Sequence, residues 1–403
     1  MNTHLIGHID ADCFYVSCER VRDQRLKGKP VGVLGNQGAC VIARSYEMRP
    51  SGVKVGMPIW KAKQLCPDGI YIKRDFQWYE ILSKQMQDIL HQYSDVVEYY
   101  SVDESFVDFG NSNEDQEKLA SHIQHEILQK AGVPVSIGFA ETRTLAKMAS
   151  EKRKPFGITI VKSDNLKDFL QNCLVEEIPG IGQKLQKRIP HLKTTLDYIQ
   201  EPQAKIRQLL HKPGEEFWYE LQGKIILPIR AKRPERKIIS RGGSIWGHHQ
   251  DPSYIWGFLV RNLERFTNQL VKENIEIHSL TVLLITSQGL TLKTTENLSD
   301  YTNSFSLLLK AAQKAFQEIF RPIWTYSHVH LFASPLRSIH KKQLSLFEEE
   351  KDQDTKVLAI KQQINAKHGA FTLRSGATAF VPQVFADETS NYEICDIDGK
   401  ICF

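Results

Sequence analysis

The chain has 403 residues, of which 41% are hydrophobic and 25% charged, and its formal net charge is +5. This length exceeds one ordinary core, so two to four domains are expected, and the mildly basic charge means that polyanion binding must depend on local patches. The seven cysteines include no CxxC pair, which argues against a zinc site or a disulfide framework and favours the reducing cytoplasm. No apolar run approaches the roughly 18 residues of a membrane span.

The first predicted strand ends in an acid. Residues 5–10 form a short apolar run that closes at Asp10, and the following CFYVSCERV is read as the opening of a helix. The aromatic pair Phe14 and Tyr15 lies in this opening. Such pairs are usually core residues beneath a helix start. The functional alternative is that one ring forms the floor under a bound sugar.

The composition changes over residues 24–76, where two short apolar runs, VGVL and ACVIA, are separated by small residues. Small residues let the backbone approach a flat ligand closely. Tyr46 and Arg49 are three positions apart, so a helical turn would place both on one face. An arginine beside a tyrosine hydroxyl suits a triphosphate, because guanidinium pairs with phosphate oxygens through two hydrogen bonds. Taken alone, however, a solvated helix face is the commoner explanation.

An acidic hairpin is predicted after an amphipathic helix over residues 78–93. Residues 96–109, VVEYYSVDESFVDF, read as strand, turn and strand, with Asp103 and Glu104 at the turn. Together with Asp10 they would form an acidic cluster that has no basic residue beside it in the sequence. Like charges raise each other's pKa unless a cation lies between them, and oxygen ligands with a phosphate substrate favour Mg²⁺. We therefore hypothesise a two-metal phosphoryl-transfer site, although adjacent acids at a turn are often merely solvated.

A ferredoxin-like layer is predicted from the order of the elements. A polar helix is expected near residues 114–131, and alternating strands and helices suit a split βαβ arrangement. The predicted strands are residues 5–10, 96–109, 133–140 and 157–161. Lys154 lies in a basic cluster before Pro155 and could reach a phosphate, but a solvated turn explains it equally well.

A small helical region is expected over residues 165–233, and its marker is EEIPGIGQKLQKRI. The turn at Gly180, Ile181 and Gly182 exposes backbone N–H groups near a helix start, and Lys184 follows it, which makes an anion site. The pattern matches a helix-hairpin-helix contact to a DNA backbone, which reads no sequence, although an ordinary helical turn remains open. The stretch 224–241 is basic and broken by proline, so it is interpreted as a tether.

Beyond the tether, the order β-α-β-β-α-β predicts a second split βαβ domain. His248 and His249 are expected in a loop. After residue 337, the motif QLSLF has the character of a short docking peptide, and a helix is expected over residues 355–367.

Taken together, these motifs resemble the Y-family DNA polymerases, with UmuC-like and some DinB-like features. The motifs that carry the resemblance are DADCFY, CVIARSYEMRPSGVKVGMP, YSVDESFVD, SIGFAETRTLAKMASEKRKPFG, IPGIG and QLSLF. Tyr46, Glu47 and Arg49 are closer to the DinB branch, whereas VLGNQGACVIAR is closer to the UmuC branch. Pro50 departs from the pattern, because it interrupts the expected helix beside Arg49.

The resemblance implies roles for individual residues. The catalytic ligands of two Mg²⁺ ions would be Asp10, Asp103 and Glu104, with the backbone carbonyl of Ala11. The residues that would bind the nucleotide are Phe14, Tyr15 (the steric gate against a ribose 2′-OH), Tyr46, Arg49 and Lys154. DNA would be bound at Gly180, Ile181, Gly182 and Lys184, and a sliding clamp at Gln343, Leu344, Leu346 and Phe347.

The resemblance also implies an α+β multidomain fold and an activity. Its expected domains are a palm (1–23 and 77–165), fingers (24–76), a thumb (166–233), a little finger (234–337) and a tail (338–403). The activity would be template-directed, low-fidelity addition of deoxynucleotides across damaged template in the DNA damage (SOS) response. Partners would be primer-template DNA, deoxynucleoside triphosphates, a sliding clamp, and UmuD-like and RecA-like proteins. The alternatives are a nucleotidyl cyclase and a catalytically silent, clamp-docked DNA-binding protein.

Overall fold

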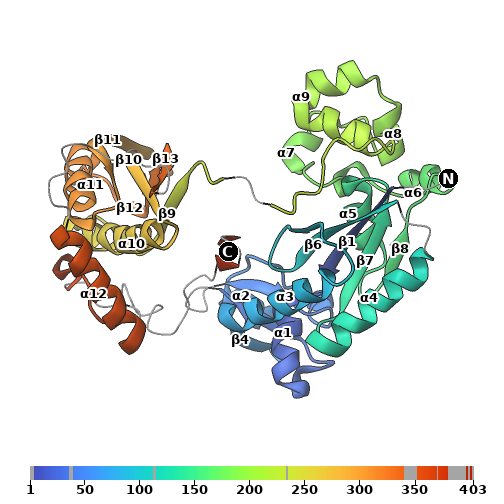
Figure 1. The fold of residues 1–403 in the computed structure, drawn as a ribbon, viewed down its shortest axis with the longest axis horizontal. Coiled ribbons are helices and arrows are strands. Elements are labelled where there is room, and N and C mark those ends of the chain that lie inside the picture. Colours follow the sequence, from blue (N-terminus) through green and yellow to red (C-terminus); the bar gives the residue numbers. More distant parts are fainter. Residues whose placement is uncertain are drawn as a thin grey trace. The chain divides into compact units, whose positions relative to one another are not determined.

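The computed structural model describes residues 4–35, 40–111, 115–232, 235–339, 352–369, 371–379, 396–397 and 400–401. The chain divides into two compact units (Figure 1). The first unit contains Met1–Arg233 and Glu393–Phe403, and the second contains Pro234–Tyr392. The predicted docking peptide at residues 343–347 lies outside the described residues. No helix in the described ranges is long and apolar enough to cross a membrane.

A five-stranded sheet forms the centre of the first unit, in the order β5-β6-β1-β7-β8. Its strands are β1 (His4–Ala11), β5 (Val97–Tyr99), β6 (Glu104–Asn111), β7 (Val135–Ala140) and β8 (Ile158–Ile160). Strand β1 pairs antiparallel with both β6 and β7, and β8 runs parallel to β7. This arrangement confirms the predicted split βαβ layer, with the expected hairpin strands observed as β5 and β6.

Helices cover both faces of this sheet. They are α1 (Phe14–Arg22), α3 (Phe76–Leu90), α4 (Gln116–Ala131) and α5 (Arg143–Lys152). Because side chains alternate along a strand, Leu5 and Ile9 of β1 pack into the core with α3 and α4, whereas Ile6 packs into the core with α5. Helix α5 lies close to β7 at Gly138, where a Cβ atom would come within 2.1 Å of the carbonyl oxygen of Ala146.

A second, three-stranded sheet occupies the glycine-rich stretch, in the order β3-β2-β4. Its elements are β2 (Val31–Leu34), β3 (Val41–Arg44), α2 (Ile59–Leu65) and β4 (Ile70–Lys73). The predicted helical turn at Tyr46 and Arg49 is wrong in detail, because a turn leads there into a 3₁₀ helix, Arg49–Ser51. Pro50 fits the first turn of this helix, where no intrahelical N–H is required. The two side chains nevertheless lie together, with the Arg49 guanidinium 3.9 Å above the centre of the Tyr46 ring.

The predicted helical region follows the five-stranded sheet. It contains α6 (Leu166–Gln171), the 3₁₀ helix Val175–Glu177, α7 (Gln183–Gln186), α8 (Thr195–Gln200) and α9 (Gln203–Glu220). Gly180 has a φ of 94°, a left-handed conformation that glycine adopts without strain. Between α9 and residue 238, the described residues form neither helix nor strand, as expected of a tether.

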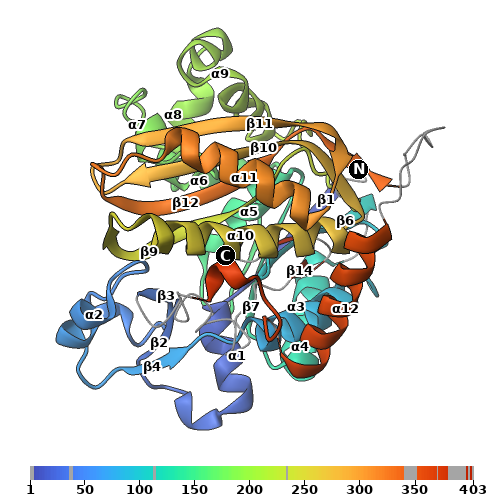
Figure 2. The ribbon, with the colours of Figure 1, turned by 90° about the vertical axis from the view of Figure 1, so that its left-hand side faces the viewer.

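The second unit has the predicted order β-α-β-β-α-β. It comprises β9 (Ile239–His249), α10 (Pro252–Lys272), β10 (Ile275–Thr286), β11 (Thr291–Thr302), α11 (Phe305–Ile319), β12 (Tyr326–Ala333) and β13 (Leu336–Ser338). Helices α10 and α11 pack side by side against the sheet (Figure 2). The loop predicted at His248 and His249 is wrong: β9 continues through both, because His249 pairs with Tyr326 of β12. The chain is therefore an α+β protein, as predicted.

The residues after β13 include the predicted helix. Helix α12 spans Asp352–His368, and a short 3₁₀ helix spans Gly376–Thr378. The side chains of Val357 and Ile360 on α12 are mostly exposed. A two-stranded sheet of β14 (Asp396–Ile397) and β15 (Lys400–Ile401) follows.

Candidate active site

The register of β1 and β6 brings the predicted acidic residues together. Asp10 lies directly opposite Glu104 in this antiparallel pair, and the N–H of Ala11 donates a hydrogen bond to the carbonyl oxygen of Asp103 at 2.9 Å. The two strands are of equal length. The acid lies near the end of β1 and at the beginning of β6, so antiparallel pairing brings Asp10 and Glu104 together. Asp10, Ala11, Asp103 and Glu104 all line one cavity of about 820 Å³.

Two lysines contact these acids, although no basic residue lies beside the acids in the sequence. The Nζ atom of Lys154 lies 2.7 Å from Oδ1 of Asp10 and 2.8 Å from Oε1 of Glu151. The Nζ atom of Lys147 forms an ion pair with Oε1 of Glu104. Lys147 belongs to α5 and is 43 positions from Glu104, whereas Lys154 follows α5 and is 144 positions from Asp10. Only the packing of α5 against the sheet reveals these contacts.

Burial shifts the pKa of two of these acids. Burial raises the pKa of Asp10 to about 9, although the charge of Lys154 acts in the opposite direction. Burial also raises the pKa of Asp103. Burial alone would lower the pKa of Lys154, but its contacts with Asp10 and Glu151 raise it. A nearby cation stabilises the charged form of a buried carboxylate. The possible donor atoms of Asp10, Ala11, Asp103 and Glu104 are all oxygens, so these four residues fit a hard divalent metal ion.

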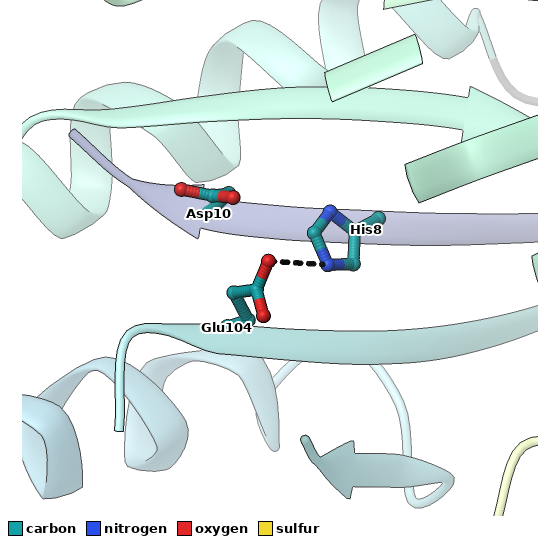
Figure 3. Close-up of side chains that lie close together, drawn as sticks. All are labelled: His8, Asp10 and Glu104. Atoms are coloured by element: carbon teal, nitrogen blue, oxygen red, sulfur yellow. Dashed lines mark ion pairs between the residues drawn. The ribbon is translucent and has the colours of Figure 1, made fainter. Parts of the chain in front are cut away.

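His8 is a member of this cluster that the sequence analysis missed. One nitrogen of its ring and one oxygen each of Asp10 and Glu104 lie within 4.8 Å of one another (Figure 3). His8 is fully buried, and burial followed by the charge of Lys147 lowers its pKa well below the ordinary value. The sequence does contain a pattern that predicts the position of His8. His8 and Asp10 are two positions apart on a strand and therefore lie on the same face of the sheet.

Ser150 and Glu104 lie at the two nitrogens of the His8 ring. Nδ1 of His8 lies 2.7 Å from Oγ of Ser150, and the hydroxyl of Ser150 is also 2.8 Å from the carbonyl oxygen of Lys147. Nε2 lies 3.7 Å from Oε1 of Glu104.

The aromatic pair of α1 lies at the cavity wall. Both Phe14 and Tyr15 line the cavity, and Phe14 is buried. The Tyr15 ring stacks on the ring of Tyr79, with centroids 4.8 Å apart, and its edge contacts Phe76. Tyr15 is therefore held between α1 and α3 while it still reaches the cavity.

The remaining nucleotide-binding candidates differ in position. Arg49 and Lys154 line the cavity, whereas Tyr46 is not among the described residues that do so. The Tyr46 hydroxyl instead donates a hydrogen bond to Oδ1 of Asp12 at 3.1 Å. Asp12, which the sequence analysis also missed, is buried and has its pKa raised by that burial.

The predicted DNA-binding hairpin lies in the helical region and is not part of the cavity lining. Ile181 is buried in the core of that region, and α7 behind it has only four residues. Gly182 has open space around its Cα atom. Contacts to DNA at this turn would therefore depend on the backbone and on Lys184 rather than on the side chain of Ile181.

Comparison with known proteins gives the family. The profile of the impB/mucB/samB family matches residues 9–151, and that of its C-terminal domain matches residues 236–346. A protein named DNA polymerase IV from Bacillus velezensis is 31% identical over 93% of this chain and 92% of its own length. The chain belongs to the Y-family of DNA polymerases.

Further relatives agree with this assignment. DNA polymerase IV 1 of Bacillus subtilis is 29% identical, with 93% of each chain covered. A Y-family DNA polymerase chimera of Dbh and Dpo4 has a TM-score of 0.71 and 26% identity, covering 82% of this chain and 98% of its own. The insertion ternary complex of Dbh DNA polymerase has a TM-score of 0.55 and 25% identity, covering 83% and 99%.

The Y-family assignment confirms the predicted activity. The protein is a translesion DNA polymerase, and hence a DNA-binding nucleotidyltransferase that depends on divalent metal ions and uses DNA and nucleotides. Neither the nucleotidyl cyclase nor the catalytically silent DNA-binding protein is favoured by these relatives. The choice between UmuC-like and DinB-like branches stays a prediction.

Proposed function

We propose that this polymerase joins deoxynucleotides to a primer 3′-OH, as directed by a template, in the cavity lined by Asp10, Asp103 and Glu104. The observation that carries the proposal is the register of β1 and β6, which pairs Asp10 with Glu104 beside Asp103. The carboxylates and the carbonyl oxygen of Ala11 would hold two Mg²⁺ ions. When bound, such ions lower the pKa of the attacking hydroxyl and neutralise charge on the leaving pyrophosphate.

Arg49 and Lys154 bind the triphosphate in this proposal. Both line the same cavity as the acids, and a guanidinium and an ammonium are the usual partners of phosphate oxygens. Tyr46 contributes by supporting Arg49, because the guanidinium lies above its ring. Lys154 also contacts one of the proposed metal ligands, because its Nζ atom lies 2.7 Å from Oδ1 of Asp10.

Tyr15 is proposed as the residue that selects deoxyribose. Its ring lines the cavity and is held by stacking on Tyr79, so that it cannot turn aside without losing this contact. A fixed ring beneath C2′ of the sugar would clash with a ribose hydroxyl. Phe14 packs beside it, with ring centroids 5.8 Å apart, and supports its position.

The division into domains is also a proposal. We assign residues 1–23 and 77–165 to the palm, 24–76 to the fingers, 166–233 to the thumb, 234–337 to the little finger and 338–403 to the tail. The separate three-stranded sheet supports the fingers, and the division of the chain after Arg233 supports the start of the little finger. Small fingers restrain the nascent base pair weakly, so we propose low fidelity and tolerance of damaged template bases.

The partners beyond DNA and nucleotides are also proposals. We propose that the turn at Gly180, Ile181 and Gly182, with Lys184, contacts the DNA backbone. QLSLF at residues 343–347 is proposed to bind a sliding clamp through Gln343, Leu344, Leu346 and Phe347. UmuD-like and RecA-like proteins are proposed as further partners. Action in the cytoplasm fits the free cysteines among the described residues.

The experiment that tests the proposed site is primer extension by acid variants. In Asp103→Asn and Glu104→Gln, extension should fall by about a hundredfold or more, because each loses a charged oxygen ligand, while affinity for primer-template DNA persists. Asp88→Asn is the matched control, because Asp88 is an exposed acid paired with Lys84 and should not affect extension. Near-normal extension by Asp103→Asn would exclude the proposed metal site.

A further inference from the structure

Glu104 has a polar neighbour at each carboxylate oxygen. The Nζ atom of Lys147 forms an ion pair with Oε1. The hydroxyl of Ser101, which donates to Oδ1 of Asp103 at 2.5 Å, lies 3.3 Å from Oε2. The side chains of Lys147 and Glu104 are only 19% and 16% exposed, so solvent weakens their attraction less than at an open surface.

The position of Lys147 is fixed by the packing of α5. This helix is capped by Thr142, whose side chain accepts a hydrogen bond from the N–H of Leu145 and donates one to the carbonyl oxygen of Glu220. Lys147 follows Ala146, whose carbonyl oxygen lies against Gly138 of β7. The backbone therefore has little freedom at the point from which Lys147 reaches Glu104.

His8 cannot take over the role of Lys147. Its Nε2 atom lies 3.7 Å from Oε1 of Glu104, which is too far for a hydrogen bond. Within the described part of the chain, Lys147 is the cation in contact with Oε1.

Lys147 approaches Glu104 from outside the cavity that we assign to the nucleotide. Glu104 and Lys154 line that cavity, whereas Lys147 is absent from its described lining. Lys147 instead lines a separate cavity of about 360 Å³, together with Tyr100 and Arg143. The ammonium group of Lys147 thus contacts the carboxylate of Glu104 from the side of the smaller cavity, whereas Lys154 lines the cavity that we assign to the nucleotide.

We propose that Lys147 is a positioning residue for the catalytic carboxylate of Glu104. Its ammonium group holds Oε1 and thereby fixes the orientation in which the carboxylate of Glu104 meets a divalent ion. This inference rests on the proposed function, because it assumes that Glu104 is a metal ligand. Lys147 also competes with the ion for the negative charge of Glu104, so it lowers the affinity for metal while it favours the productive geometry.

The test compares Lys147→Met with Lys147→Arg and the intact protein. In Lys147→Met, kcat for single-nucleotide addition should fall roughly 10- to 100-fold, while KM for the nucleotide is unchanged. Binding of Mn²⁺, followed by electron paramagnetic resonance without nucleotide or DNA, should become roughly 3- to 10-fold tighter, because a competing cation is lost. Lys147→Arg retains the charge and should restore part of kcat.

Lys152→Met is the matched control. Lys152 lies on the same helix, but its Nζ contacts Glu177 and the carbonyl oxygen of Asn172, so its loss should change neither Mn²⁺ affinity nor kcat. Damage to the fold would weaken both metal binding and catalysis, and thermal unfolding of each variant provides an independent check. Tighter Mn²⁺ binding together with a lower kcat therefore distinguishes the proposed role of Lys147 from damage to the fold.

Three results would overturn the proposal: an unchanged kcat in Lys147→Met, weaker or unchanged Mn²⁺ binding, or a raised KM for the nucleotide. The last would mean that Lys147 contacts the triphosphate directly. The variant Glu104→Gln distinguishes failure of the proposal for Lys147 from failure of the proposed active site. If Glu104→Gln loses extension while Lys147→Met does not, only the role of Lys147 is wrong; if Glu104→Gln retains extension, the proposed site itself is wrong.

Discussion

The hydroxyl of Tyr46 donates a hydrogen bond to Oδ1 of Asp12 at 3.1 Å, and this contact joins the three-stranded sheet to the end of β1. Asp12 also accepts hydrogen bonds from the hydroxyl of Ser136, 3.0 Å from each carboxylate oxygen, and from the N–H of Phe156 at 2.7 Å. One buried carboxylate thus connects β1, β7, the turn before β8 and the chain near Arg49. Asp12 lies beside the cavity residues Ala11 and Cys13, so it stabilises the frame that holds the proposed site.

We predict that Asp12→Ala destabilises the first unit by about 2–4 kcal/mol, because several buried donors lose their acceptor at once. Tyr46→Phe removes only one of these bonds and should cost about 1 kcal/mol. Unfolding in urea, followed by circular dichroism, measures both values. Equal losses for the two variants would show that the other contacts of Asp12 contribute nothing.

Tyr15→Ala should relax the selection of sugar. Removing the ring opens space at the cavity wall beside Phe76 and Tyr79, so a ribonucleotide should be incorporated roughly 100-fold more efficiently relative to its deoxynucleotide counterpart. Competition between matched ribo- and deoxynucleotides in single-nucleotide addition provides the measurement. Tyr15→Phe is the control, because it retains the ring. Unchanged sugar selectivity in Tyr15→Ala would remove this residue from the proposed role.

Glu220 should hold the beginning of the tether. Its carboxylate is buried and accepts hydrogen bonds from the N–H groups of Thr144, Ile226 and Leu227, at 3.1, 2.7 and 2.8 Å. In Glu220→Ala these donors lose their acceptor, so the stability of the first unit should fall by about 3 kcal/mol or more. Trypsin should also cleave faster after Lys224, as followed by mass spectrometry. A cleavage rate equal to that of the intact protein would mean that other contacts fix the tether.

Acid should weaken the second unit through His330. Burial, followed by the charge of His328, lowers the pKa of His330, and its ring lies against Gly242 of β9. The unfolded chain therefore binds a proton at higher pH than the folded chain does. Stability should be constant above the ordinary pKa of about 6.5 and should fall as the pH decreases below it. His330→Asn should reduce this loss in urea unfolding at pH 5 and pH 7, and an unchanged pH dependence would contradict the prediction.

Several elements could be predicted from the sequence because their signals are local. Short apolar runs beside acidic residues identified β1 and β6, and helical periodicity identified α3. Pro, Gly and charge runs located the tether and the short turn at Gly180. The prediction for Tyr46 and Arg49 was only partly right, because a turn leads there into the short 3₁₀ helix Arg49–Ser51, although the two side chains still lie together.

The sequence by itself was sufficient to predict the fold class, the order of the helices and strands along the chain, and the choice of Asp10, Asp103 and Glu104 as candidate site residues. These features depend on hydrophobic periodicity and motif spacing, which are properties of neighbouring residues. Only the tertiary structure decided what surrounds those acids: His8 beneath Glu104, Lys147 and Lys154 against the carboxylates, and Asp12 bound to Tyr46. These contacts arise where β1, β6 and α5 meet, and most of them join residues more than 30 positions apart. Their partners are selected by packing and burial, which no local pattern records.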